Sequence, residues 1–280
     1  MPESIGCLRK AVAAELAELE SPLLEADLII AAMAERDRAW VHCHSADPAP
    51  ESLKEKVLHA ASRRKKREPL QYILGFCDFD GLSVLVGPGC LVPRPETEFL
   101  VECAAGLFDG TAFLDWGIGT GCIALALLNR FPNARAFMAE KNPQSLQWAE
   151  KNLEKFGFSD RASLIRTEVP EDLPPMQVSL VVSNPPYIPS SICAALMPEV
   201  SRYEPRLALD GGEDGLDPYR GLFELCRRVL RPEGFFCVEY GGESQTERLR
   251  AMAPNAFREV SLLRDLAGHD RVLAWQFRPE

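Results

Sequence analysis

The chain has 280 residues, 46% of them apolar, which excludes an intrinsically disordered protein and leaves room for about two domains. Its formal net charge of −10 argues against a protein that lives on nucleic acid, because phosphate binding needs a broad basic face. Nine scattered cysteines without a CxxC pair predict reduced, buried thiols, and without a signal peptide or a membrane-length apolar stretch we expect a cytoplasmic protein with no metal site.

The first 67 residues have the periodicity of helices. Apolar residues recur at helical spacing from Leu8 to Leu19, and Ser21-Pro22 predicts an N-cap followed by proline at the first helical position. A third helix is expected over residues 51–66 and ends in the basic run Arg63–Arg67. Positive charge suits a helix C-terminus, so we interpret the run as a solvated helix end, with an acidic partner or RNA as the alternative.

The pattern changes after Pro69. Residues 76–86 favour strands, and Gly87-Pro88-Gly89 is typical of a turn, so residues 76–92 predict a hairpin that connects two domains. Pro95 then predicts the start of a new helix, with Glu96 and Glu98 in its first turn.

From Thr111 onward, strand-like apolar runs alternate with helical segments. This alternation predicts an α/β fold with a mainly parallel sheet and helices on both faces. The last two runs are joined by a short link containing Gly268, so we expect the final strand to be antiparallel. The predicted strands are Ala112–Asp115, Arg135–Glu140, Ala162–Arg166, Val178–Ser183, Gly234–Tyr240, Arg258–Leu263 and Arg271–Phe277.

A glycine-rich loop follows the first of these strands and precedes a helix expected at Cys122–Asn129. Residues 115–121 read Asp-Trp-Gly-Ile-Gly-Thr-Gly, which is G-x-G-x-G and not the G-x-G-x-x-G of dinucleotide binding. The next strand ends at Glu140, where an acid can accept hydrogen bonds from ribose hydroxyls. Without a P-loop lysine, loop and acid together favour S-adenosylmethionine over NAD or ATP.

The fourth strand leads directly into Asn184-Pro185-Pro186-Tyr187, which we expect to be the catalytic segment. Two prolines remove two backbone donors and stiffen the turn. The Asn184 side-chain oxygen and the Pro185 carbonyl can then accept hydrogen bonds from one NH2 group, while Tyr187 lies against its flat face. Such a grip would direct a weakly nucleophilic amide or amino nitrogen at an activated methyl group and stabilise the developing positive charge. The expected cofactor-binding residues are Gly117, Ile118, Gly119, Thr120, Gly121, Glu140 and Asn184.

With these motifs, nearly the whole chain resembles the peptide chain release factor N(5)-glutamine methyltransferases, the PrmC/HemK family. The tetrapeptide alone is shared by many amino-methyltransferases, and its combination with the other segments makes the resemblance specific. Those segments are Arg67–Gly75 (Arg-Glu-Pro-Leu-Gln-Tyr-Ile-Leu-Gly), Val92–Glu98 (Val-Pro-Arg-Pro-Glu-Thr-Glu), Tyr203-Glu204-Pro205, Gly211–Leu216 (Gly-Gly-Glu-Asp-Gly-Leu) and Val238–Gly241 (Val-Glu-Tyr-Gly).

The resemblance implies a class I methyltransferase fold with a seven-stranded sheet. It implies a helical substrate-binding domain at 1–68, a hairpin connector at 69–93 and a catalytic domain at 94–280. It also implies methylation of the glutamine in the Gly-Gly-Gln motif of release factors, with S-adenosylmethionine becoming S-adenosylhomocysteine. We expect a monomer without sequence-specific nucleic-acid or membrane partners, and Arg94, Pro95 and Glu98 on the cofactor side.

The sequence departs from the family pattern at two cofactor positions. Glu140 stands where Asp is commoner, and Thr167-Glu168 stands where an Asp followed by an aromatic or apolar residue usually contacts adenine. Two other functions stay open at this stage. One is methylation of an exocyclic amino group of a nucleic-acid base, since the tetrapeptide also serves such groups. The other is a binding module that has kept the fold and lost its activity.

Overall fold

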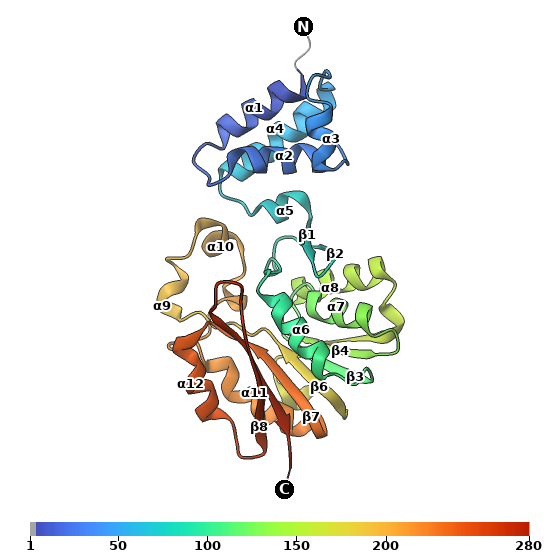
Figure 1. Cartoon of the computed structure of the whole chain (residues 1–280), viewed down its shortest axis with the longest axis vertical. Coiled ribbons are helices and arrows are strands. Elements are labelled where there is room, and N and C mark those ends of the chain that lie inside the picture. Colours follow the sequence, from blue (N-terminus) through green and yellow to red (C-terminus); the bar gives the residue numbers. More distant parts are fainter. Residues whose placement is uncertain (1–3, 280) are drawn as a thin grey trace. The chain divides into compact units, whose positions relative to one another are not determined.

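A computed structural model describes residues 4–279, and its internal contacts divide the chain into two compact units (Figure 1). The helical unit comprises the chain up to Phe76 together with Met197–Tyr203. The sheet unit comprises Cys77–Leu196 and the chain from Glu204 onward. The segment 197–203 therefore belongs to the helical unit, although both of its flanking segments belong to the sheet unit.

The helical unit has a small apolar core of its own. Ile5, Leu8 and Val12 of the first helix are buried with Ile29 of the second and Val57 of the fourth. Ser21 is the N-cap of a helix that begins at Pro22, and a helix covers 51–65, so both predictions are confirmed. The helices of this unit are α1 (Ile5–Glu15), α2 (Pro22–Met33), α3 (Arg38–Cys43), α4 (Glu51–Lys65), α5 (Leu70–Leu74) and α10 (Pro198–Tyr203).

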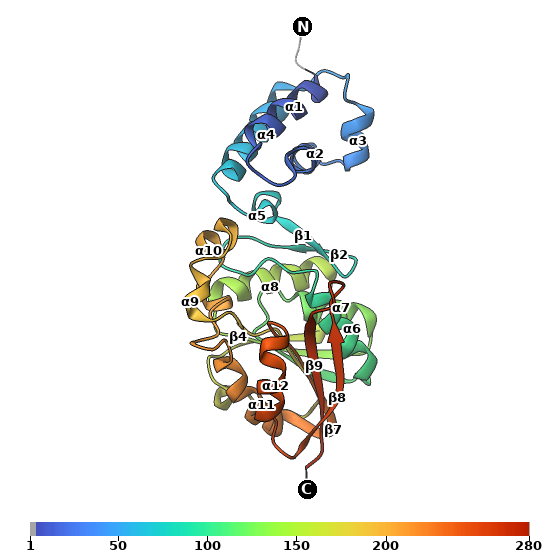
Figure 2. The ribbon, with the colours of Figure 1, turned by 60° about the vertical axis from the view of Figure 1, so that its left-hand side comes forward.

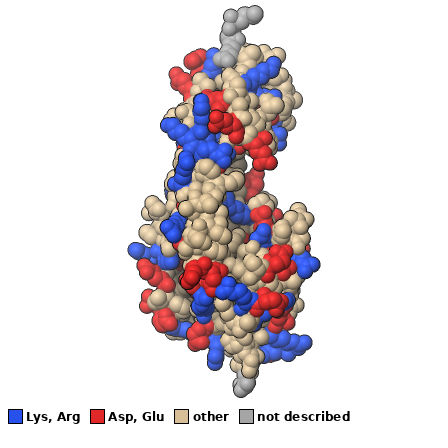
Figure 3. Space-filling model, turned by 90° about the vertical axis from the view of Figure 1, so that its left-hand side faces the viewer, with Lys and Arg blue, Asp and Glu red and all other residues tan. Residues whose placement is uncertain are grey.

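The basic run at the end of α4 is largely paired within the helical unit. Arg64 is buried and bonds to Glu25 and, at 2.8 Å, to Glu199 of α10. Arg67 also reaches Glu199 at 2.8 Å, and Arg63 bonds to Glu68 at 2.6 Å. On this unit's surface, basic and acidic side chains lie beside each other (Figure 3). The interpretation of the run as a solvated helix end is therefore wrong for Arg64, whose partners come from distant parts of the chain.

The predicted hairpin exists, but its turn is not where the sequence indicated. Strands β1 (Phe76–Phe79) and β2 (Leu82–Leu85) are joined at Asp80-Gly81, whose φ values are 49° and 75°. Two successive positive φ values suit a tight two-residue hairpin loop, for which Asp-Gly is a preferred pair. The prediction that Gly87–Gly89 is the hairpin turn was therefore wrong, although Pro88 and Gly89 do form a separate turn after β2.

Hydrogen bonds hold helix α8 (Pro143–Phe156) against the Gly87–Gly89 segment. The Trp148 indole donates to the Pro88 carbonyl at 3.1 Å, and the Asn142 side chain donates to the Gly89 carbonyl at 2.7 Å. A Cβ at Gly87 would lie 2.3 Å from the Trp148 ring, so the close approach requires glycine. The backbone after the hairpin is thereby fixed beside the N-terminal end of α8.

A seven-stranded sheet with order β5-β4-β3-β6-β7-β9-β8 forms the centre of the sheet unit. The strands β3 to β7 are parallel, and β9 is antiparallel to both of its neighbours, as predicted for the final strand. The strands are β3 (Ala112–Trp116), β4 (Arg135–Glu140), β5 (Ala162–Arg166), β6 (Val178–Ser183), β7 (Leu230–Glu239), β8 (Phe257–Arg264) and β9 (Asp270–Phe277).

Helices cover both faces of this sheet (Figures 1 and 2). Successive strand residues point to opposite faces, so Phe113 packs in the cluster with α6–α8 and Leu114 packs in the cluster with α11 and α12. The helix predicted to open at Pro95 begins two residues later, with Glu96 as its N-cap. The helices are α6 (Thr97–Leu107), α7 (Cys122–Arg130), α8, α9 (Ser190–Cys193), α11 (Asp217–Val229) and α12 (Glu243–Met252), with 3-10 turns at Ser159–Arg161, Pro170–Asp172 and Arg206–Ala208.

The cysteines form no disulfide, and most of them are buried. Cys7 and Cys43, on α1 and α3, are exposed, so the prediction of buried thiols was wrong for these two. Between residues 4 and 279, each helix is too short or too polar to cross a membrane.

Candidate functional site

A cavity of about 480 Å³ lies at the carboxyl ends of the parallel strands in the sheet unit. The ends of parallel strands are the usual binding edge of open α/β sheets, because loops there can diverge around a ligand. Four neighbouring strands contribute residues just past their ends. The lining includes Arg94, Thr97, Trp116, Gly117, Ile118, Gly119, Thr120, Glu140, Ser145, Thr167, Glu168, Asn184, Pro185, Pro186, Leu207, Ala208 and Leu222.

The glycine-rich loop between β3 and α7 forms one wall of this cavity. Gly117 and Gly119 have φ values of 80° and 55°, a conformation that side chains with a Cβ rarely adopt. The Gly117 N–H donates to the Ala139 carbonyl at 2.9 Å, which ties the loop to β4. Gly121 does not line the cavity but caps α7, and a Cβ there would lie 2.9 Å from Met138 Cε. The first two glycines thus expose backbone to a ligand, while the third permits close packing.

Glu140, at the end of β4, is held by backbone N–H groups. Its Oε2 accepts from Gly119 at 3.0 Å, and its Oε1 accepts from Lys141 and Asn142 at 2.9 Å each. An ionised carboxylate has about four acceptor positions, so these three bonds leave capacity for a ligand hydroxyl. Its side chain therefore links the glycine loop to the second strand and presents a fixed acid to the cavity.

Asp115, in β3 just before the glycine loop, is a buried carboxyl group without a cationic partner. Its Oδ2 accepts from the Ala124 N–H at 3.2 Å, and its Oδ1 has no hydrogen-bond partner among the described residues. Burial raises the pKa of Asp115 to about 7, against the lowering effect of that bond. The first turn of α7 is thereby joined to the strand beneath the loop.

The Asn184-Pro185-Pro186 segment borders the same cavity from the end of β6. The Asn184 side-chain Nδ2 donates to the Thr97 hydroxyl at 3.1 Å. Because the NH2 end of this amide is engaged by the protein, its oxygen is the end that remains to accept from a ligand.

Tyr187 lies behind this segment and does not line the cavity. Its hydroxyl donates to Glu239 Oε1 at 3.4 Å, and its carbonyl accepts from the Gln245 side chain at 3.0 Å. Burial raises the pKa of Tyr187, with a further contribution from the Glu239 charge. In this arrangement Tyr187 supports the proline turn.

The Gly-Gly-Glu-Asp-Gly segment packs directly against this turn. A Cβ at Gly211 would lie 2.7 Å from the Pro186 carbonyl oxygen, and one at Gly215 would lie 2.3 Å from the Tyr187 carbonyl oxygen. The Gly211 N–H also donates to the Ile188 carbonyl at 2.9 Å. The two glycines are therefore required by contact with the tetrapeptide.

Of the three residues expected on the cofactor side, only Arg94 borders the cavity. It bonds to both oxygens of buried Glu204 at 2.8 and 2.6 Å. Glu98 instead accepts from the Asp80 N–H of the hairpin turn at 3.0 Å, and Pro95 is absent from the lining.

Sequence reasoning missed several cavity residues, Thr97 and Trp116 among them. Trp116 stands inside the glycine motif, so its position was a usable signal. Thr167 and Glu168 line the cavity although they depart from the family pattern, and the Thr167 N–H donates to the Glu140 carbonyl at 3.1 Å. Within residues 4–279, no group of three or more His, Cys, Asp or Glu side chains is arranged to hold a metal ion.

Comparisons with known proteins agree along the length of the chain. Residues 8–75 match the family model of the PrmC N-terminal domain, and residues 95–194 match that of the methyltransferase small domain. The chain is 40% identical over 258 residues to a release factor glutamine methyltransferase of Geobacter sulfurreducens, covering 91% of this chain and 89% of that protein. It is 33% identical over 281 residues to the protein of that name from Agrobacterium fabrum, covering 98% and 96%.

A comparison of structures gives the same fold. A methyltransferase from Pyrococcus furiosus superimposes with a TM-score of 0.57 at 15% identity, covering 81% of this chain and 98% of that one. At this identity the likeness concerns the fold alone, and it agrees with the class I methyltransferase architecture of the sheet unit.

Proposed function

The chain belongs to the release factor glutamine methyltransferase family, and we propose that it methylates the side-chain amide nitrogen of a glutamine in peptide chain release factors. The methyl donor is S-adenosylmethionine and the target lies in the Gly-Gly-Gln motif. The observation that carries the proposal is the Asn184 amide, which is held by its NH2 end at the edge of a cavity that begins at the glycine loop.

The cavity residues fit this methyl donor. A volume of about 480 Å³ falls in the range of about 300–1,000 Å³ usual for small-molecule sites. The glycine loop at the start of α7 suits the amino-acid part of the donor, and Glu140 suits the two ribose hydroxyls. The apolar side chains of Leu222 and Ile118 offer surface to the rest of the nucleoside. When bound, S-adenosylmethionine supplies an electrophilic methyl group on a sulfonium.

The chain's own residues would orient the target nitrogen. Asn184 Oδ1 and the Pro185 carbonyl accept the two N–H bonds of the glutamine amide, which directs the nitrogen lone pair toward the methyl group. The same two oxygens stabilise the positive charge that grows on nitrogen during transfer. The proton leaves the nitrogen after transfer, so no strong base is needed in contact with the substrate.

The substitution Asn184→Ala tests this proposal. We expect about a 100-fold lower rate of methyl transfer to a release factor, because one of two charge-stabilising acceptors is lost. Transfer is followed with radiolabelled S-adenosylmethionine, and mass spectrometry of the Gly-Gly-Gln peptide locates the label. Calorimetry of cofactor binding separates a loss of methyl transfer from a loss of cofactor affinity, because Asn184 also borders the cavity.

Three outcomes would overturn it. If wild-type protein binds the cofactor but leaves the release factor unlabelled, the substrate is wrong. Efficient labelling of naked nucleic acid, weakened by salt, would support methylation of a base amino group instead. A protein that binds no cofactor would be the inactive binding module.

The division of labour along the chain is part of the proposal. Residues 1–68 would hold the release factor, 69–93 would connect, and 94–280 would carry out catalysis. We propose that the protein acts in the cytoplasm as a monomer, where release factors work in translation termination.

A further inference from the structure

The amide of Asn184 has two ends of nearly the same shape and opposite chemistry. Only its oxygen can accept a hydrogen bond from the NH2 group of a glutamine, while its own NH2 group would face that group donor to donor. Rotation by 180° about the last side-chain bond exchanges the two ends. An enzyme that works as proposed above therefore needs a device that selects one orientation.

Thr97 is the residue that touches the NH2 end. It is the first residue of α6, its side chain is buried, and its hydroxyl oxygen accepts from Asn184 Nδ2 at 3.1 Å. A hydroxyl can both donate and accept, so Thr97 alone would tolerate either orientation of the amide. The orientation of the Asn184 amide must therefore be selected by a group that fixes the direction of the Thr97 hydroxyl proton.

Glu239, at the end of β7, supplies that second group. Its carboxyl is fully buried; Oε1 accepts from the Tyr187 hydroxyl at 3.4 Å, and Oε2 has no hydrogen-bond partner among the described residues. Burial raises the pKa of Glu239 to about 7, although the nearby Thr97 hydroxyl and the charge of Arg271 lower it. Glu239 thus lies within reach of the Thr97 proton and has an oxygen available to accept it.

These contacts form a chain with one direction. Above about pH 7, where Glu239 is ionised, its carboxylate only accepts, so a Thr97 hydroxyl that donates to it keeps only its lone pairs for Asn184. Those lone pairs favour the NH2 end of Asn184 and disfavour its oxygen. The Asn184 oxygen is then left for the substrate. Tyr187 donates to the same carboxyl group, so this buried acid is linked to the catalytic turn directly through Tyr187 and, by way of Thr97, through Asn184.

We propose that Thr97 and Glu239 are positioning residues that fix the Asn184 amide with its oxygen toward the target nitrogen. This inference rests on the proposed function, because it assigns the site a use for that orientation. Neither residue touches the reacting atoms; both act through Asn184.

The first test compares two substitutions at Thr97. Thr97→Val keeps the shape and removes the hydroxyl, and we expect about a tenfold lower kcat for release-factor methylation, since one orienting hydrogen bond is lost. Thr97→Ser keeps the hydroxyl and should stay within about twofold of wild type. Cofactor affinity is measured by calorimetry in both variants, and kcat is compared at saturating cofactor, because Thr97 borders the cavity.

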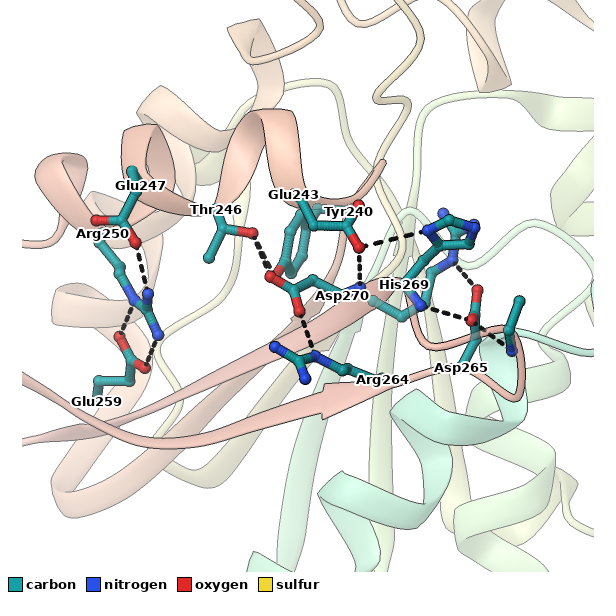
Figure 4. Close-up of polar contacts among 12 residues, drawn as sticks. Tyr240, Glu243, Thr246, Glu247, Arg250, Glu259, Arg264, Asp265, His269 and Asp270 are labelled. Atoms are coloured by element: carbon teal, nitrogen blue, oxygen red, sulfur yellow. Dashed lines mark hydrogen bonds and ion pairs between the residues drawn. The ribbon is translucent and has the colours of Figure 1, made fainter.

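A double-mutant cycle separates positioning from general damage. If Thr97 acts through Asn184, then Thr97→Val should cost nothing further once Asn184→Ala is present, because the group it orients is gone. An additive loss would assign Thr97 a structural role and overturn the proposal. The matched control is Thr246→Val on α12, a buried threonine whose hydroxyl bonds to Asp270 at 2.9 Å away from the cavity (Figure 4). It should lower stability without lowering kcat.

A readout independent of activity distinguishes failure of this inference from failure of the proposed function. In nitrogen-15 NMR spectra, the Asn184 side-chain NH2 signal is identified by its loss in Asn184→Ala. We expect one of its two protons to exchange slowly with solvent in wild type and in Thr97→Ser, and both to exchange rapidly in Thr97→Val and Glu239→Gln. Equal exchange rates of the Asn184 NH2 protons in wild type and Thr97→Val would contradict the positioning role, even if methylation is observed.

Discussion

Both units of this protein contain buried charged groups, but the lone buried acids among the described residues lie in the sheet unit. In the helical unit, Asp27 is 2% exposed and is bonded to Arg9 and His42, and Arg64 is bonded to Glu25 and Glu199. In the sheet unit, Asp115 and Glu239 are fully buried beside the cavity and receive only backbone or hydroxyl donors. Buried ion pairs occur in both units, since Arg94 also bonds to buried Glu204 in the sheet unit. Asp115 and Glu239 differ from these residues because neither has an ion-pair partner among the described residues.

That contrast separates structural from functional use of charge. A buried ion pair is costly to break, because the remaining partner is left uncompensated in a medium of low dielectric. A buried acid without a cationic partner destabilises the fold when it ionises. Its presence beside a cavity therefore indicates a functional site, where a chemical role outweighs the loss of folding stability. The following predictions test this contrast.

The largest effect is expected at Arg64. Arg64→Ala should lower the free energy of unfolding of the helical unit by about 3–5 kcal/mol, because Glu25 and Glu199 lose their shared partner. Urea unfolding of the full chain, followed by circular dichroism, measures the change. The neighbouring Arg63, 35% exposed and paired with Glu68, is the matched control, and Arg63→Ala should cost about 1 kcal/mol or less. Equal losses for both variants would contradict a special role for the buried pair.

The next effect concerns pH and the lone acid Asp115. Its pKa lies at about 7 in the folded state against an ordinary value of 3.8, so the folded state keeps a proton that the unfolded chain has lost between these values. Stability should therefore fall as pH rises through that window. Relative to Asp115→Asn, wild type should lose about 3 kcal/mol between pH 5 and pH 8. A pH-independent difference in unfolding free energy between the two proteins would show that Asp115 does not titrate in this range.

A smaller effect is expected in cofactor binding. Glu140→Ala should weaken the binding of S-adenosylmethionine by about 10- to 100-fold, because the ribose loses an acceptor and the glycine loop loses one of its links to β4. Calorimetry measures the affinity. Glu150→Ala, an exposed glutamate on α8 outside the cavity, should bind like wild type. Unchanged cofactor affinity in Glu140→Ala would show that Glu140 does not contribute to cofactor binding.

The smallest effect is expected at the surface of the sheet unit. Glu247 is 80% exposed and bonds at 2.6 Å to Arg250, which also bonds to Glu259 (Figure 4). Glu247→Ala should change the free energy of unfolding by less than about 0.5 kcal/mol, because solvent and salt screen exposed pairs. A loss of unfolding free energy comparable to that of Arg64→Ala would mean that solvent exposure does not distinguish weak ion pairs from strong ones.

Local patterns allowed most of the fold to be predicted. The parallel strands were recognised because buried β-strands have continuous apolar runs, and Arg135–Glu140 and Val178–Ser183 were placed to the residue. The hairpin turn was misplaced because Gly87-Pro88-Gly89 is a turn, but not the one that joins β1 to β2. Its two glycines are required by contacts with Trp148 and Gln144 of α8, which are distant in the sequence.

For the site, the sequence determined which chemical groups are present, and the tertiary structure decided which of them act together. The glycine loop, Glu140 and the Asn-Pro-Pro-Tyr segment could be recognised because backbone freedom and proline stiffness are local properties. The partners of these groups could not. Thr97 and Glu239 lie in segments that resemble the family, but both are far from Asn184 along the chain, and nothing in those segments shows that they approach it. Contacts between distant segments depend on how strands and helices pack, and only the packed structure specifies them.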